Sequence, residues 1–383
     1  MISSRIATCT ILSCLIAALV AGADEPEKRQ ETQAASPAFL VEFRRLKSEY
    51  DISIQKRFEK FEMDSSGIKT TDERERLLKS VRSDSEAIIN PAVQKSFELV
   101  QPHATDSAAV EPLVWIATRG RTTDNAQAAA VLLMEHHLTN PQTIDMAFGL
   151  RRSDLPWAER LLRAQIAAPD LPEEQKPKQV LALAQTLQSL IEKRPDDAGK
   201  VEAEAIQLFT QLGRKYANQE YRGGITFGEL AKSSLFEIQN LSVGKVAPDI
   251  VGEDLDGQAF KLSDYRGKVV LLSFWASWCG PCMAEVPHER ELVQRHANRP
   301  FVLLGVNADL EKSSVTPILK QEQITWRSFW CGEKGPFGLI ARTWNVNAWP
   351  TVYLIDHSGV IRAKTLQDAA LEELIVEAEK AMK

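Results

Sequence analysis

The feature that most constrains the fold is the apolar stretch Val269–Trp275, which runs into the sequence Ala-Ser-Trp-Cys-Gly-Pro-Cys. An apolar run of this kind is typical of a strand buried on both faces of a sheet. Residues 282–296 after it show a helical pattern, which Pro287 is expected to kink. Cys279 and Cys282 are therefore predicted to stand where a buried strand ends and a helix begins.

Strands and helices alternate on both sides of this stretch. A linker at 243–250 leads into 254–268, which predicts a hairpin with an Asp-Gly turn at 256–257. Further strands are predicted at 301–306, 326–330, 351–355 and 360–363, and further helices at 311–321, 337–344 and 366–382. This alternation predicts an α/β domain over 243–383, with a central sheet covered by helices on both faces.

A different pattern occupies residues 38–240. Phe39, Phe43, Leu46 and Tyr50 lie at i, i+4, i+7 and i+11, on one face of a helix. Strand-like alternation is scarce and no fixed repeat period is present, so the pattern predicts an all-α domain of about six to nine helices and not a solenoid. The sequence assigns no role to this domain.

The N-terminus predicts export. Arg5 precedes the apolar stretch Ile6–Val20, and Ala21-Gly22-Ala23 fits a signal-peptidase site. The apolar stretch is shorter than the ~20 residues of a membrane-spanning helix. We expect a signal peptide over 1–23, a flexible lead-in over 24–37, and a periplasmic or other extracytoplasmic location. An uncleaved membrane anchor is the alternative.

The number of cysteines and the net charge limit the possible functions. Cleavage after Ala23 leaves Cys279, Cys282 and Cys331, too few for a disulfide-stapled scaffold. In an exported protein the close pair can form a disulfide that persists. The net charge is -6 and no long basic block is present, so we expect no nucleic-acid partner.

The position of the cysteine pair predicts redox chemistry. Cys279, at the first turn of a helix, would have its thiolate stabilised by free N–H groups and by the helix dipole. Cys282, one turn further on, could then attack a mixed disulfide and resolve it. Pro281 leaves no N–H unsatisfied in the first turn, and Gly280 keeps the approach to the sulfur open.

Metal binding and a structural disulfide are the alternatives for this pair. A zinc site usually needs two more ligands, yet no second Cys-x-x-Cys follows, and His288 and His296 are eight residues apart. His136 and His137, in the helical region, face different sides of a helix. A structural role is disfavoured because so short a loop constrains little of the unfolded chain. We expect neither a metal nor a cofactor.

The stretch "VVLLSFWASWCGPC" resembles the active-site segment of the thioredoxin superfamily. Residues 243–383 resemble its exported TlpA/ResA-like branch of thiol–disulfide oxidoreductases, through "APDI", "LSDYRGK", "CGPCMAEVP" and "WPTVYLID". The resemblance implies a thioredoxin fold. It makes Cys279 the attacking thiol and Cys282 the resolving thiol, and it leaves the helical domain outside the match.

The resemblance also implies a proton acceptor. Glu285 matches a buried acid that tunes the cysteines in this branch, and its spacing allows it to share a helical face with Cys282. Burial that raised its pKa would let it take the proton of the resolving thiol. Ser273 stands where thioredoxin has a buried Asp, a departure that Glu285 could offset.

Three further residues are implied to contact the substrate. Pro350 matches the cis-proline that faces the disulfide, and the backbone of Trp349 before it would pair with an extended substrate peptide. Trp278 would shield and orient the site. Cys331 follows a predicted strand in a glycine-containing loop, so it is either a third redox thiol or a small unpaired residue.

Together these features predict an extracytoplasmic thiol–disulfide oxidoreductase that exchanges disulfides with protein substrates, as a reductant supplied by a membrane electron donor. A thiol peroxidase-like antioxidant protein is one alternative, although Ser277 and Trp278 occupy the approach that a peroxide-polarising site needs. A docking protein whose helical domain binds a partner is the other. Reduction potential is not fixed by Gly280-Pro281 alone.

Overall fold

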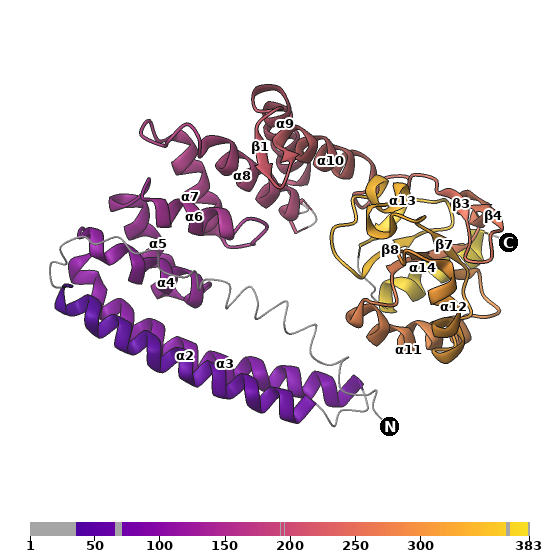
Figure 1. The fold of residues 1–383 in the computed structure, drawn as a ribbon, viewed down its shortest axis with the longest axis horizontal. Coiled ribbons are helices and arrows are strands. Elements are labelled where there is room, and N and C mark those ends of the chain that lie inside the picture. The colour runs from indigo at the N-terminus through magenta and orange to yellow at the C-terminus, as the bar shows by residue number, and fades with distance from the viewer. Residues whose placement is uncertain (1–35, 66–70, 192, 195, 365–367, 382–383) are drawn as a thin grey trace. The chain divides into compact units, whose positions relative to one another are not determined.

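The computed structural model describes residues 36–65, 71–191, 193–194, 196–364 and 368–381 (Figure 1). The predicted signal peptide and almost all of the predicted lead-in lie outside these residues. Contacts divide the chain into two compact units, with the boundary between Lys232 and Ser233. No helix in the described ranges combines the length and apolar character needed to cross a membrane.

The first unit is built from helices, as predicted. Along the chain they are α2 (Ala38–Ser65), α3 (Thr71–Val100), α4 (Val110–Gly120), α5 (Asp124–His136), α6 (Pro141–Gly149), α7 (Pro156–Ala167), α8 (Lys176–Leu190), α9 (Ala198–Lys215) and the first part of α10 (Phe227–Asn240). The long helices α2 and α3 lie side by side (Figure 1). Phe43 and Tyr50 of the predicted apolar face are buried, and both rings pack edge-on against Trp115 of α4.

One element of this unit was not predicted. A small antiparallel hairpin, β1 (Glu220–Arg222) and β2 (Ile225–Thr226), precedes α10. Its turn is made by Gly223 and Gly224, which have φ of 60° and 79°. Side chains other than glycine rarely adopt this backbone conformation, and a Gly-Gly pair is a known signal for such a turn.

The second unit contains a five-stranded mixed sheet in the order β7-β6-β5-β8-β9. Its strands are β5 (Val269–Trp275), β6 (Phe301–Asn307), β7 (Ser328–Trp330), β8 (Thr351–Ile355) and β9 (Ile361–Ala363). β5, β6 and β7 are mutually parallel, whereas β8 runs antiparallel to β5 and β9 antiparallel to β8. The predicted central strand is therefore β5, which is buried along its whole length.

Helices cover both faces of this sheet. α11 (Gly280–Arg295) packs on β6, and α14 (Asp368–Ala381) packs on β5. His296, directly after α11, contacts Phe301 of β6 and Glu372 of α14, so these two helices share a face. Strand alternation puts Phe274 on the opposite face, where it packs on Trp344 directly after α13 (Leu339–Thr343). α12 (Lys312–Gln321) connects β6 to β7.

The segment predicted as a linker is part of the second unit. Gly244 and Ala247 donate backbone hydrogen bonds to Ile361 and Gly359, and Ile361 donates to Lys245. The segment therefore lies along the β9 edge of the sheet. The hairpin that follows, β3 (Val251–Glu253) and β4 (Ala259–Lys261), has the predicted Asp-Gly turn, with Gly257 at φ 81°.

Candidate active site

The cysteine pair lies at the junction between β5 and α11. Cys279 and Cys282 form a disulfide, with 5.2 Å between their Cα atoms. Cys279 is the N-cap of α11, and the backbone N–H of Cys282 donates to its Sγ at 3.1 Å. An N–H aimed at this sulfur and the positive end of the helix would both stabilise a thiolate there once the disulfide is reduced. The local geometry thus favours Cys279 as the nucleophile.

A buried carboxylate fixes the loop that leads into the cysteines. Asp309 accepts from the backbone N–H of Ser277 at 2.9 Å and from its hydroxyl at 2.6 Å. Asn307 donates to the same carboxylate at 2.7 Å, and the indole of Trp330 donates to the Asp309 carbonyl. Sequence reasoning did not identify Asp309. The available signal was its place two residues after β6, whose carboxyl end meets that of parallel β5.

Two tryptophans and a proline stand at the same end of the sheet. The indole of Trp278 is 54% exposed and its ring centroid is 5.9 Å from that of Trp349. The Trp349–Pro350 peptide bond is cis. Because β8 is antiparallel to β5, this bond, just before β8, lies beside the end of β5, where Thr351 pairs with Phe274. The structure therefore brings together the three residues expected to contact substrate.

The buried acid on α11 is Glu289, which sequence reasoning missed. Glu285 is only half-buried, whereas Glu289 shares the buried face of the helix with Cys282 and is 6% exposed. Burial raises the pKa of Glu289 to about 7; a hydrogen bond from Ser273 opposes this shift, and the nearby charge of Glu285 adds to it. Ser273 thus contacts a carboxyl that comes from the helix. The signal in the sequence was the seven-residue spacing of Cys282 and Glu289, which returns to the same helical face.

Cys331 lies at the predicted end of the sheet but is poorly suited to redox chemistry. β7 is parallel to β6, so the residue after it does point toward the active-site end. The thiol is buried, and this burial raises its pKa to about 12. Since the thiolate is the reactive form, the structure favours a small unpaired residue over a third redox thiol.

The described residues also bear on metal binding, the alternative to redox chemistry. Within the part of the chain that the structure describes, no group of three or more His, Cys, Asp or Glu side chains could hold a metal ion. His137 is buried, and its Nε2 is 2.7 Å from the carbonyl oxygen of Ala104. That contact gives His137 a structural role.

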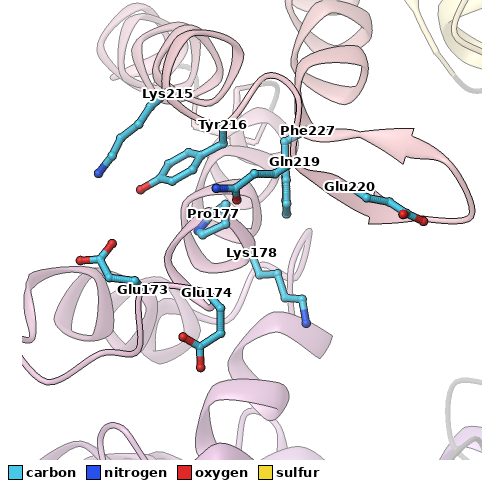
Figure 2. Close-up of a pocket in the computed structure, with 9 residues that line it drawn as sticks. All are labelled: Glu173, Glu174, Pro177, Lys178, Lys215, Tyr216, Gln219, Glu220 and Phe227. Atoms are coloured by element: carbon cyan, nitrogen blue, oxygen red, sulfur yellow. The ribbon is translucent and has the colours of Figure 1, made fainter.

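Figure 2 shows a pocket in the helical unit, of about 530 Å³. The side chain of Lys215 lies over the ring of Tyr216 there, at 5.0 Å. The residues that line it are Glu173, Glu174, Pro177, Lys178, Lys215, Tyr216, Gln219, Glu220 and Phe227. None of these lining residues is a cysteine.

A thioredoxin-type sheet with a cysteine pair capping the helix after its central strand defines a dithiol oxidoreductase. Comparison with known proteins agrees: the model of the AhpC/TSA family matches residues 243–364. "Thiol-disulfide oxidoreductase ResA" of Bacillus cereus is 32% identical over 136 residues, which are 36% of this chain and 76% of that protein. Its counterpart in Geobacillus kaustophilus is 35% identical over 122 residues, 32% of this chain and 68% of the relative.

The chain therefore belongs to the ResA family of thiol–disulfide oxidoreductases and is an enzyme of that class. A solved structure, a putative thiol:disulfide interchange protein DsbE from Chlorobium tepidum, is 32% identical. The match covers 36% of this chain and 97% of the Chlorobium chain, with a TM-score of 0.32. The family match lies within the second unit, so the helical unit is an addition to the part that the family defines.

Proposed function

We propose that this protein is an extracytoplasmic reductant of protein disulfides. The observation that carries the proposal is the Cys279–Cys282 disulfide at the start of α11. The sequence of residues 1–23, typical of a signal peptide, supports the location. The Gly-Pro dipeptide between the cysteines is like that of reducing thioredoxins and supports the direction.

The reaction proceeds by two exchanges. In the reduced protein the Cys279 thiolate attacks one sulfur of a client disulfide, and the client's other sulfur leaves as a thiolate. The Cys282 thiolate then attacks Sγ of Cys279, which releases the client's second sulfur and closes the protein's own disulfide. Two electrons pass to the client, and a membrane-bound dithiol donor returns two electrons to the pair.

Glu289 accepts the proton that Cys282 loses in the second exchange. Residues 282 and 289 are two turns apart on one buried face, and helical side chains tilt toward the N-terminus. The two Cα atoms are about 10 Å apart along the axis, and the side chain of Glu289 reaches back over part of this distance. A group whose pKa is about 7 can accept and release a proton near neutral pH. Glu285, the acid that the resemblance implies, then acts through its charge on Glu289.

The client is bound as an extended peptide beside Pro350. The backbone before this residue lies next to the end of β5, where an added strand could pair with it. Trp278 and Trp349 form an aromatic wall at that position. Both rings can bury apolar surface of the client while its disulfide lies against Cys279.

Reduction of insulin disulfides by the dithiothreitol-charged protein tests the function. Wild type should turn over, Cys279→Ser should be inactive, and Cys282→Ser should accumulate a mixed disulfide that gel electrophoresis detects without reductant. Thiol trapping after acid quenching of the source cells tests the direction. A pair found mainly oxidised in cells that contain its donor would contradict a reductant, and an inactive wild type would remove the enzymatic role.

A further inference from the structure

Exposed apolar side chains gather at the active-site end of the sheet, on the side away from Pro350. Phe337 is 76% exposed and Leu339 is 80% exposed, the two highest values for large apolar side chains among the described residues. Phe337 lies in the loop after β7, and Leu339 begins α13 at the end of that loop. Leu310, which follows β6, is 58% exposed. We call Leu310, Phe337 and Leu339 the β6–β7 patch.

A chain of contacts joins this patch to the cysteines. Ser277, two residues before Cys279, donates two hydrogen bonds to Asp309, and Leu310 directly follows Asp309 in the chain. A methyl group placed on Gly335 would lie 2.9 Å from Cδ2 of Leu310, so the loop after β7 packs against Leu310. These contacts connect the loop that carries the patch to the loop that carries the cysteines.

The loop that carries the patch is held tightly. Gly335 donates to the carbonyl of Gly332, and Gly338 donates to the carbonyl of Gly335. A Cβ on Gly338 would lie 2.0 Å from the carbonyl oxygen of Cys331, so the backbone there packs directly on the end of β7. Phe337 and Leu339 flank this close contact and are left facing solvent. A fixed loop that presents bulky apolar groups to water is typical of a binding surface.

We propose that the β6–β7 patch is an apolar subsite for the client polypeptide, a specificity that rests on the proposed function. Neighbouring strands are about 4.8 Å apart, so β7 lies roughly 10 Å from β5. An extended peptide advances about 3.3 Å per residue. The subsite therefore takes a bulky aliphatic or aromatic side chain about three residues from the client cysteine that Cys279 attacks.

The position of the patch identifies this occupant. Every client must bring a disulfide to Cys279, and a client segment that extends toward β7 passes the loop of Ser277, next to the patch. The charged side chains exposed around the loop, Glu333, Lys334 and Arg342, have mixed signs. A mixed rim of this kind fits a polypeptide better than an anionic membrane surface, which attracts clustered positive charge.

The test uses the full-length protein and the double variant Phe337→Ser/Leu339→Ser. Two peptides carry one cysteine each, as a mixed disulfide with thionitrobenzoate, and have Leu or Asp three residues from it. The free reagent 5,5′-dithiobis(2-nitrobenzoate) is the small disulfide. Val246→Ser is the matched control. Val246 is comparably exposed, but it pairs with Val360, directly before β9, and so lies at the opposite edge of the sheet from β7.

We expect wild type and Val246→Ser to prefer the Leu peptide in kcat/KM. The double variant should lose this preference, with a fall of roughly tenfold for the Leu peptide and little change for the Asp peptide or the small disulfide. Equal kcat/KM for both peptides in wild type overturns the subsite, as does an equal loss on the small disulfide. The subsite is also overturned if wild type is a dimer and the double substitution dissociates it without changing kcat/KM for either peptide. No turnover of the small disulfide by wild type means instead that the proposed function fails.

Discussion

A carboxyl buried between α11 and β5 gives the reaction a pH dependence that a surface carboxyl would not. Glu289 has a pKa of about 7, so its basic form becomes available only as pH rises through neutrality. We expect Glu289→Gln to slow insulin reduction roughly tenfold to a hundredfold at pH 8 and to flatten the rise in rate between about pH 6 and 8. Initial rates across that range measure the effect.

Glu285→Gln is the matched control for this prediction. Glu285 lies on the same helix and carries the same charge but is half-buried. The Glu285→Gln variant should keep the rise in rate. The midpoint of this rise should move to lower pH, because the charge of Glu285 raises the pKa of Glu289 and the substitution removes that charge. If Glu285→Gln flattens the profile and Glu289→Gln does not, the proton acceptor is Glu285, as the resemblance implied.

Glu289 also affects the stability of the folded protein. The pKa of Glu289 is raised in the folded state from its ordinary value of 4.5 to about 7, so the folded protein binds this proton more tightly than the unfolded chain does. Stability from this group is fully present below about pH 4.5 and is lost as pH rises toward 7. Glu289→Gln should remove this loss, which is on the order of 3 kcal/mol. Urea unfolding of the oxidised protein at pH 5 and 8 measures it, and an unchanged pH dependence would exclude a raised pKa.

Cys331 should be dispensable for turnover. Its thiol is buried and its pKa is raised to about 12, so almost none of it is thiolate at neutral pH. We expect Cys331→Ala to leave insulin reduction within about twofold of wild type. In the native oxidised protein, 5,5′-dithiobis(2-nitrobenzoate) should release no thionitrobenzoate within minutes. A rapid release, or a large loss of turnover, would restore Cys331 as a third redox thiol.

At the level of elements, the loop between β5 and α11 depends on a contact with a different strand. The carboxylate of Asp309 accepts two hydrogen bonds from Ser277 and one from Asn307. Asp309→Ala should free the loop, lower the rate of disulfide exchange several-fold and reduce stability by about 1–3 kcal/mol. Stopped-flow reduction of a small disulfide and urea unfolding measure the two effects.

A second buried aspartate provides the control. Asp356, in the turn between β8 and β9, accepts hydrogen bonds from Ser358 and from the backbone of Val360. Asp356→Ala should therefore reduce stability by a similar amount and leave the exchange rate unchanged. The turn of Asp356 lies at the C-terminal end of β8, and the active site lies at the other end of this strand. Equal losses of rate in both variants would show that Asp309 acts through stability alone.

The elements of the second unit could be predicted because each has a local signal. The apolar run predicted β5, Asp-Gly predicted the β3–β4 turn, and the cysteine pair predicted the start of α11. Glu289 and Asp309 could not be identified in the same way. Their roles depend on which residues lie across from them, Ser273 on the neighbouring strand and Ser277 on the neighbouring loop, and pairing between elements is not recorded in the spacing of either one.

At the level of the whole molecule, the helical unit raises a different problem. Its helices follow from apolar periodicity, but neither the sequence pattern nor the family match assigns this unit a role. Where the second unit begins is also not readable from the family match, which starts at residue 243. The structure places the boundary earlier, inside α10, after Lys232.

The last part of α10 belongs to the fold of the second unit. Leu241, directly after α10, is buried in the core that also holds β5 and the cysteines, and Phe236 packs against that core. Glu237 accepts a hydrogen bond from Asn345 at 2.7 Å and pairs with Lys364. A fragment that starts at residue 243 would lose these contacts while keeping the complete family match.

We therefore expect residues 233–383 to fold alone and to reduce a small disulfide at the rate of the full-length protein, since the core around the cysteines lies within them. A fragment of 243–383 should be less stable by about 2–5 kcal/mol, the cost of emptying the sites of Leu241 and Phe236. Urea unfolding of both fragments measures this difference. Because the removed contacts lie on Asn345 and Lys364 and not on the loop of Ser277, the shorter fragment should keep its exchange rate while it remains folded. Equal stability of the two fragments would place the true boundary at the start of the family match, and α10 would then belong wholly to the helical unit.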